Sequence, residues 1–104
     1  MRLTLSCVPA FLAVAALASA CGGGPSSVRG VVIGVEGSTF GDVPGFTLRT
    51  DDGDTLRFRL ALEDEAAFPP EHLRTHMATL EPVRVWYRLE GRGRVAYRVE
   101  DAPK

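Results

Sequence analysis

Residues 46–60 read F-T-L-R-T-D-D-G-D-T-L-R-F-R-L, and this stretch decides the fold of the chain. Apolar and polar side chains alternate on both sides of an acidic, glycine-containing turn, which is the pattern of two strands that each bury one face. A two-residue turn would place an apolar side chain opposite an arginine and so mix the two faces. A three-residue loop of residues 51–53 instead places Leu48 opposite Leu56, and it puts Gly53 where a left-handed backbone is required. We therefore predict an antiparallel hairpin with a three-residue loop.

A second hairpin is predicted near the end of the chain. Apolar side chains alternate along residues 83–89 and again along residues 95–99. With a loop of residues 91–93, the pairing follows by counting outward: 89 with 95, 87 with 97, 85 with 99, 86 with 98 and 84 with 100. This register places Trp86 opposite Arg98 on the outer face of the hairpin.

Between the two hairpins a helix is predicted to open at Pro69 and to end before Pro82. Prolines suit a first helical turn, and Glu71 favours the positive end of the helix dipole. The apolar residues of this segment recur at helical spacing as one narrow stripe, formed by Leu73, Met77 and Leu80.

Ahead of the hairpins, residues 28–36 read V-R-G-V-V-I-G-V-E, a β-branched run that predicts a strand. Gly30 and Gly34 share one face, and glycines on one face of a strand are typical of a sheet that bends to close on itself. The predicted order is therefore strand, long loop, hairpin, helix and hairpin. The expected class is all-β with one short helix.

This order of elements resembles the OB-fold, a small five-stranded Greek-key barrel. Two sequence patterns are also similar to those of small secreted bacterial domains of unknown function. They are a G-x-V-x-x-V-x-G-like first strand, from Gly30 to Gly37, and an F-x-L-x-T-x-D-G hairpin, from Phe46 to Gly53. The resemblance implies an OB-like β-barrel domain over residues 28–102, and it implies no known active site.

Residues 1–20 have the three parts of a secretory signal: a basic start at Arg2, an apolar middle and a small-residue end. The sequence Ala18-Ser19-Ala20-Cys21 resembles the lipobox of bacterial lipoproteins, although Ala18 stands where that motif usually has Leu. The resemblance implies that Cys21 becomes the first mature residue and is acylated. Residues 21–27 would then be the lipidated cysteine and a flexible Gly- and Ser-rich linker. The alternative is an ordinary cleaved signal that leaves Cys21 as a free thiol.

The composition of the mature chain excludes several functions. Removal of residues 1–20 leaves 11 Lys and Arg residues against 13 Asp and Glu residues, a formal charge of −2. Nucleic acid is not expected as a partner, because such binding relies on cationic neutralisation of phosphates. Cys21 is the only cysteine outside the signal, so an internal disulfide cannot form. The sequence also has no Gly-x-Ser-x-Gly nucleophile motif and no phosphate-binding loop, so we expect neither an enzyme nor a cofactor.

His72 and His76 are the two histidines of the chain, and they lie one helical turn apart. That spacing projects both imidazoles from one helix face, as in zinc-binding helices. The pair lacks the glutamate of the hydrolytic version of this motif, but residues 63–65, Glu-Asp-Glu, could supply a further ligand. The alternative is that both rings lie at the edge of the buried stripe and bind no metal.

The outer face of the hairpins carries a tryptophan among arginines. The residues are Arg57, Arg84, Trp86, Arg88 and Arg98. Such a surface suits a ligand with a flat face and negative charge, and for an exported protein we expect an anionic glycan, a lipid headgroup or an envelope protein. The alternative is that Trp86 only packs against Arg98, or lies under the loop of residues 37–45.

These observations lead us to expect a lipoprotein on the outward face of a bacterial plasma or outer membrane. We expect it to act there as a non-catalytic binding or accessory module. Two alternatives stay open: a metal-binding lipoprotein that uses His72 and His76, and a subunit of an envelope complex that contacts its partner through Trp86.

Overall fold

The computed structural model describes residues 26–38 and 42–103. The predicted export signal of residues 1–20 and the predicted lipid-attachment residue Cys21 lie outside the described residues. Over the described part, five strands and one helix follow one another along the chain. They are β1 (Ser26–Val35), β2 (Gly45–Thr50), β3 (Thr55–Leu60), α2 (His72–Thr79), β4 (Val83–Glu90) and β5 (Gly93–Asp101).

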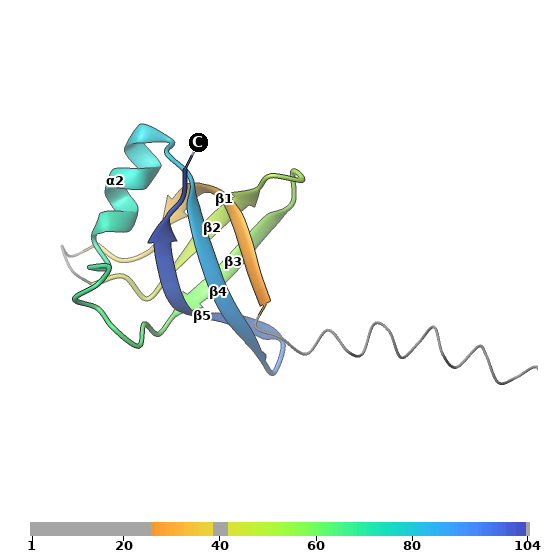
Figure 1. The fold of residues 1–104 in the computed structure, drawn as a ribbon. Helices are drawn as coiled ribbons and strands as arrows, with labels where there is room; N and C mark the ends of the chain where they lie inside the picture. Colours follow the sequence, from red (N-terminus) through yellow and green to blue (C-terminus); the bar gives the residue numbers. More distant parts are fainter. Residues whose placement is uncertain (1–25, 39–41, 104) are drawn as a thin grey trace, which may run out of the picture.

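The strands form a closed barrel in the order β1-β2-β3-β5-β4, and α2 lies at one end of it (Figure 1). Antiparallel pairing of β1 with β4 closes one side of the barrel. A short parallel pairing closes the other, where Arg59 and Leu60 of β3 meet Val95 and Ala96 of β5. The predicted small all-β barrel, OB-like with one helix between the third and fourth strands, is confirmed.

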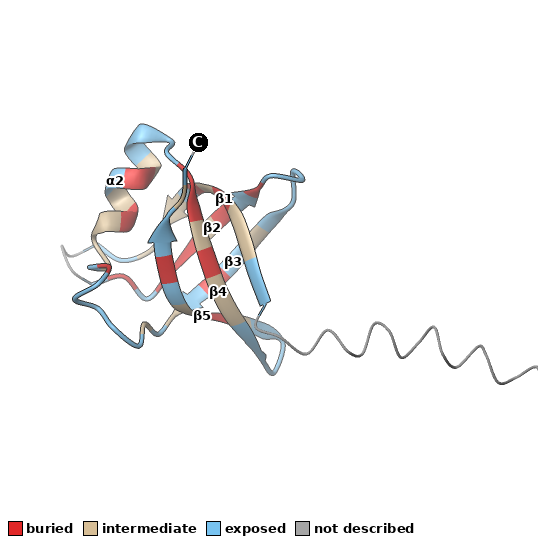
Figure 2. Cartoon of the chain, in the orientation of Figure 1, coloured by how far each residue is buried: buried red, intermediate tan, exposed pale blue. Residues whose placement is uncertain are grey.

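The β2–β3 hairpin has the predicted register. Leu48 pairs with Leu56 and Phe46 with Phe58, and Gly53 in the loop has a φ of 93°. The pairing puts the rings of Phe46 and Phe58 5.2 Å apart in a stacked arrangement, with both side chains fully buried. This aromatic pair is the centre of the barrel core, which Figure 2 shows as buried segments on the strands.

The β4–β5 hairpin follows the predicted register only in the half that lies away from its loop. Trp86 pairs with Arg98 as expected, but the register then shifts, and Tyr87 pairs with Ala96. The loop is therefore tighter than the predicted loop of residues 91–93, since Glu90 already pairs with Gly93. The shift is a β-bulge, which bends a strand and lets β5 reach β3 to close the barrel. Leu89, which alternates with Val83 and Val85 in the sequence, is 72% exposed near the end of β4.

The first strand begins at Ser26, two residues before its predicted start, so Ser26 and Ser27 belong to the barrel and not to the linker. A register shift against β2 between Val32 and Gly34 leaves Ile33 41% exposed. Gly30 faces a close approach of β2, because a Cβ at this position would lie 2.3 Å from the Arg49 carbonyl oxygen. The sheet can close at this point because Gly30 has no side chain that would collide with β2.

The helix α2 begins at His72, later than predicted, and it covers one end of the barrel. Leu73 is fully buried and Met77 packs against the core, as the predicted stripe requires. Leu80 does not follow that stripe: it caps the helix in a left-handed conformation with φ 62° and is 62% exposed. His76 is buried instead, with 3% exposure, so the prediction that it lies at the edge of the stripe was wrong.

Within residues 26–38 and 42–103, we find no helix with the length and apolar character needed to cross a lipid bilayer.

Candidate functional site

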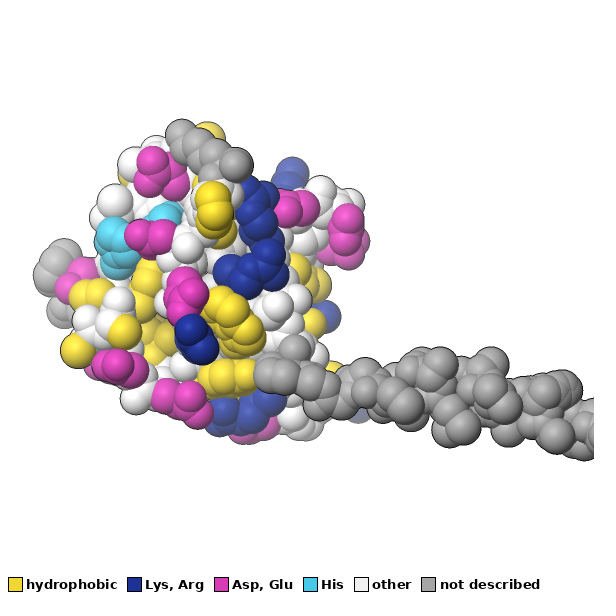
Figure 3. Space-filling model, viewed as in Figure 1, with side chains coloured by type: hydrophobic (Ala, Val, Ile, Leu, Met, Phe, Trp, Pro, Cys, Tyr) yellow, Lys and Arg dark blue, Asp and Glu magenta, His cyan; other side chains and the backbone are white. Residues whose placement is uncertain are grey.

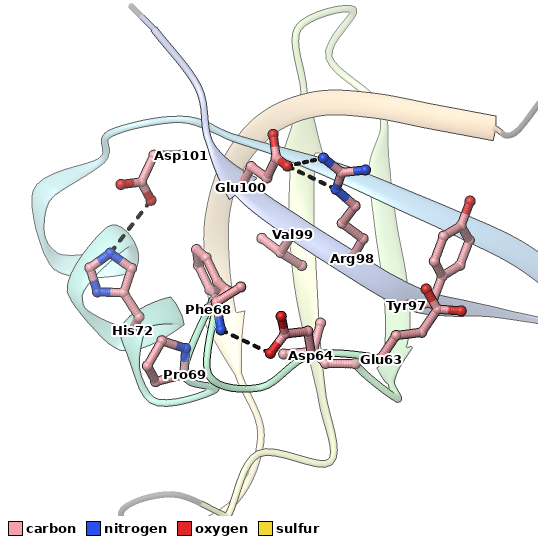
Figure 4. A pocket seen from close by; sticks show the side chains of 12 residues that line it. Glu63, Asp64, Phe68, Pro69, His72, Tyr97, Arg98, Val99, Glu100 and Asp101 are labelled. Carbon is pink, nitrogen blue, oxygen red and sulfur yellow. Dashed lines mark hydrogen bonds and ion pairs between the residues drawn. The ribbon is translucent and has the colours of Figure 1, made fainter.

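An open groove of about 530 Å³ lies between β5, the start of α2 and the loop that connects β3 to α2 (Figure 4). We call it the β5 groove. Its apolar lining residues include Leu62, Ala67, Phe68 and Val99. Its carboxylates are Glu63, Asp64, Glu100 and Asp101, and the lining also includes Pro69, His72, Tyr97 and Arg98. The groove therefore combines apolar surface with a concentration of negative charge.

The connecting loop that forms one wall of the groove is held by Asp64. Its Oδ1 accepts hydrogen bonds from the backbone N–H groups of Ala66 at 3.1 Å and Ala67 at 3.2 Å. Side chains that bond their own backbone a few residues on stabilise such turns. Phe68, next in the chain, is only 5% exposed, so the loop is also fixed to the core by an aromatic anchor.

The charge of the groove is not balanced by its one arginine. The guanidinium of Arg98 donates to Glu100 on the same strand, with Nε 2.8 Å from Oε2. This pair leaves Glu63, Asp64 and Asp101 as further carboxylates along the groove. The groove consequently suits a cationic ligand better than an anionic one.

At the helix end of the groove, the two histidines meet Asp101, the last residue of β5. The Nε2 atom of His76 lies 2.7 Å from Asp101 Oδ1, and the Nε2 atom of His72 lies 3.5 Å from the same oxygen. Figure 3 shows the histidine side chains in cyan beside a carboxylate in magenta. The ring centroids of His72 and His76 are 4.8 Å apart with an interplanar angle of 87°, so the rings meet edge to face.

The second ring nitrogen of His76 also has a partner. Its Nδ1 lies 2.8 Å from the backbone carbonyl oxygen of Glu81, just beyond the helix. A carbonyl oxygen can only accept a hydrogen bond, so Nδ1 carries a hydrogen and donates it. The aromatic ring of Phe68 packs against both histidines, with its centroid 5.0 Å from that of His72 and 6.0 Å from that of His76. His76 is therefore held by both ring nitrogens and by packing.

The predicted pairing of His72 with His76 on one helix face is present, but the acidic partner differs from the expected one. Residues 63–65 are the sequence's candidates for a further ligand, but Asp64 bonds its own loop. Asp101, 25 residues beyond His76, takes that place. The predicted register, with Arg84 opposite Glu100, places Asp101 beside Val83 at the start of β4, but it does not place the helix there. Periodicity does not show that α2 lies over this end of β5.

The predicted tryptophan face has a different character from the β5 groove. Trp86 is half-buried, and the guanidinium carbon of Arg98 lies 4.6 Å from its ring centroid, which is the cation–π packing considered as the alternative. Arg57 is not beside Trp86, because β5 separates its strand β3 from β4 in the barrel.

Most of the arginines on this face are paired with carboxylates. Arg57 donates to Glu36 at 2.6 Å, and Arg88 and Arg59 both donate to Glu90, at 2.6 Å and 3.0 Å. These hydrogen bonds hold the pKa values of Glu36 and Glu90 below their ordinary value. Arg84 donates to the Ser27 hydroxyl oxygen at 3.3 Å and forms no ion pair with residues 26–38 or 42–103. Three glutamates thus offset five arginines, so most guanidinium groups are held by a carboxylate and the face keeps only a small net positive charge.

No protein-family model matches this chain, and no curated protein matches it. The functional interpretation consequently rests on the geometry of the groove and of the His72–His76–Asp101 cluster.

Proposed function

We propose that this protein is a membrane-tethered, non-catalytic binding module that holds a basic segment of an envelope protein in the β5 groove. The observation that carries the proposal is the combination of apolar lining and several carboxylates in one open groove. A peptide with alternating basic and apolar residues matches that surface, because its cations meet the carboxylates while its apolar side chains cover Phe68 and Val99.

The sequence supports a lipid on Cys21 as the tether. Cys21 precedes the first strand residue, Ser26, by a short glycine-rich segment, which allows the barrel to stand close to a membrane surface. Lipid attachment at a lipobox cysteine follows export, in keeping with the signal-like residues 1–20. The localisation that follows is the outward face of a bacterial membrane.

The barrel separates the start of β1 from the groove end that carries Asp101. Ser26 pairs with Tyr87, whereas Gly30 and Asp101 both pair with Val83. Four strand residues, about 13 Å, therefore lie between the level of Ser26 and the level of Asp101. In Figure 1, β1 begins near the β4–β5 loop, and α2 lies toward the opposite end of the barrel. A tether that leads into Ser26 would leave the helix end of the groove directed away from the membrane.

An anionic glycan or lipid headgroup on the Trp86 face is a weaker candidate for the ligand. Such a ligand needs several arginines with free charge, whereas Arg57, Arg59, Arg88 and Arg98 are all paired with glutamates. A ligand there would have to displace these carboxylates.

The proposal is tested in two arms. In the first, cells that express the full chain or its Cys21→Ser variant are fractionated, and the membrane form is measured by intact mass spectrometry. We expect a lipid mass on Cys21 and loss of the variant from the membrane fraction. An unmodified Cys21 in the membrane fraction would contradict the tether.

In the second arm, a peptide that alternates lysine and phenylalanine is titrated into the isotope-labelled chain, and backbone amide shifts are followed by NMR. We expect saturable shifts at Phe68, Tyr97 and Val99. Binding should be about 1.4- to fivefold weaker for Glu63→Gln, because one exposed charge contact contributes about 0.2–1 kcal/mol. The matched control is Glu65→Gln, a neighbouring glutamate outside the lining of the groove. Shifts centred on Trp86 would refute the groove as the binding site.

A further inference from the structure

The geometry points to a binding site for a divalent transition-metal ion of the zinc type, formed by His72 Nε2, His76 Nε2 and Asp101 Oδ1. This inference goes beyond the proposed function, since it does not depend on the tether or on what the rest of the groove binds. The three ligand atoms all lie within 4.8 Å of one another. They come from two successive turns of α2 and from the end of β5, so the ion would join the helix to the barrel.

The distances from Asp101 Oδ1 to the two imidazole nitrogens are near those of a zinc site. The three ligand atoms as a set lie within 4.8 Å of one another, so an ion would draw them closer together. With zinc–ligand bonds of about 2.0–2.1 Å, two ligands of a tetrahedral ion lie about 3.3 Å apart. His72 Nε2 is already 3.5 Å from Asp101 Oδ1. His76 Nε2 is 2.7 Å from that oxygen, so this contact must open by about 0.6 Å to admit an ion. The Asp101 side chain is 69% exposed, which leaves it free to make that adjustment.

The hydrogen bonds of His76 also favour a cation at this position. Because Nδ1 donates its hydrogen to the Glu81 carbonyl, a neutral ring turns the lone pair of Nε2 toward Asp101. Two acceptor atoms cannot face each other at 2.7 Å unless a proton or a metal ion lies between them. A backbone carbonyl that holds Nδ1–H while Nε2 faces the ion is the usual environment of a metal-binding histidine.

The backbone after α2 is arranged to supply that carbonyl. Leu80 has φ 62°, and among the described residues it is the one non-glycine residue with positive φ. This conformation is costly for a side chain with a Cβ, and Leu80 gains little from packing because it is 62% exposed. The left-handed turn directs the chain so that the next residue, Glu81, places its carbonyl oxygen on His76. A left-handed residue is a common way to end a helix, and here it also sets the position of the carbonyl that holds His76.

The three ligands leave part of the coordination sphere open. The His72 side chain is 40% exposed and lines the β5 groove together with Asp101 (Figure 4). Two imidazoles and one carboxylate suit zinc and other first-row divalent ions, whereas calcium and magnesium prefer oxygen ligands alone. A fourth ligand, water or a donor group of a bound molecule, would therefore enter from the groove.

The test is calorimetric titration of zinc chloride into the full-length chain, prepared without an affinity tag, extracted in a mild detergent and treated with EDTA before use. We expect one zinc ion per chain with a Kd of about 1 μM or lower. His72→Gln and Asp101→Asn should each weaken binding about tenfold or more. Both replaced side chains are partly exposed, so the variants are expected to fold even if a variant of the buried His76 does not.

The matched control is Asp52→Asn, which makes the same carboxyl-to-amide change in the exposed β2–β3 loop and should leave the Kd unchanged. As an independent readout, nitrogen-15 NMR of the imidazoles should show both Nε2 resonances shifting on zinc addition while His76 Nδ1 keeps its hydrogen. The inference is overturned if no binding heat is seen at a zinc concentration about 100-fold above the expected Kd. It is also overturned if Asp101→Asn binds zinc as tightly as the unaltered chain, or if zinc binding requires only Cys21.

Discussion

The outer face of β3, β4 and β5 and the helix end of the barrel both pair basic side chains with carboxylates, but they do so in opposite environments. On the strand face, Arg57 and Glu36 retain 59% and 38% of their side-chain exposure. At the helix end, the side chain of His76 is only 4% exposed, although its partner Asp101 is open to solvent. Exposed charges can exchange their partner for water, whereas a buried ring cannot. Pairs of a basic residue and a carboxylate are therefore loosely held surface contacts on the strand face, whereas the pair at the helix end has one fixed arrangement.

The largest expected effect on this comparison is that of His76→Ala. The substitution removes a buried ring, its packing against Phe68 and both of its hydrogen bonds. We expect the free energy of unfolding to fall by about 2–4 kcal/mol, measured by urea denaturation with EDTA present. A loss below about 1 kcal/mol would mean that the helix end is no more constrained than the strand face.

An intermediate effect is expected for Arg98→Ala. This change removes the guanidinium that stacks on Trp86 and its ion pair with Glu100, both at the surface. The free energy of unfolding should fall by only about 0.5–1 kcal/mol, and the Trp86 emission should change as its ring becomes more exposed. The control is Arg92→Ala in the β4–β5 loop, which should alter neither property. An effect as large as that of His76→Ala would remove the distinction between the two regions.

The smallest effect concerns pH. The hydrogen bond from Arg57 lowers the pKa of Glu36 below 4.5, and hydrogen bonds from Arg88 and Arg59 do the same for Glu90. Because the folded-state pKa is the lower one, the stabilisation is present above pH 4.5 and is lost as the pH falls through the folded-state pKa. We expect melting curves recorded between about pH 3 and pH 6 to show this loss, and Glu36→Gln to reduce it.

Salt provides the control for that experiment, because both glutamates are at the surface. In about 0.5 M sodium chloride the contribution of Glu36 should be largely screened, so the variant and the unaltered chain should show the same pH dependence. A pH dependence that survives high salt would assign the effect to other carboxyl groups.

Much of the fold could be predicted because its signals are local. Counting residues outward from the loop at residues 51–53 predicted the β2–β3 register, including Leu48 opposite Leu56. The same reasoning failed in the second half of the β4–β5 hairpin, where Tyr87 pairs with Ala96. Strict alternation assumes a regular ladder, and the bulge that breaks it lies where Ala96 of β5 also pairs with Leu60 of β3.

The sequence predicted the two histidines of the His72–His76–Asp101 cluster but not its carboxylate. The spacing of His72 and His76 predicted that their rings share a helix face, and the structure places them edge to face. Asp101 could not be selected among the carboxylates, because its position beside them depends on how α2 packs over the barrel end. The burial of His76 depends on the same packing, which turns the helix so that His76 rather than Leu80 faces inward.

The amino-acid sequence by itself determined the class of the domain, the order of its elements, the first hairpin and the histidine pair. These follow from spacings of two to four residues, which backbone geometry converts directly into shared faces. Only the tertiary structure decided the β5 bulge, the burial of His76 and the choice of Asp101. Those depend on closing a barrel and seating a helix on it, where contacts between distant segments outweigh local preference because they bury the apolar core.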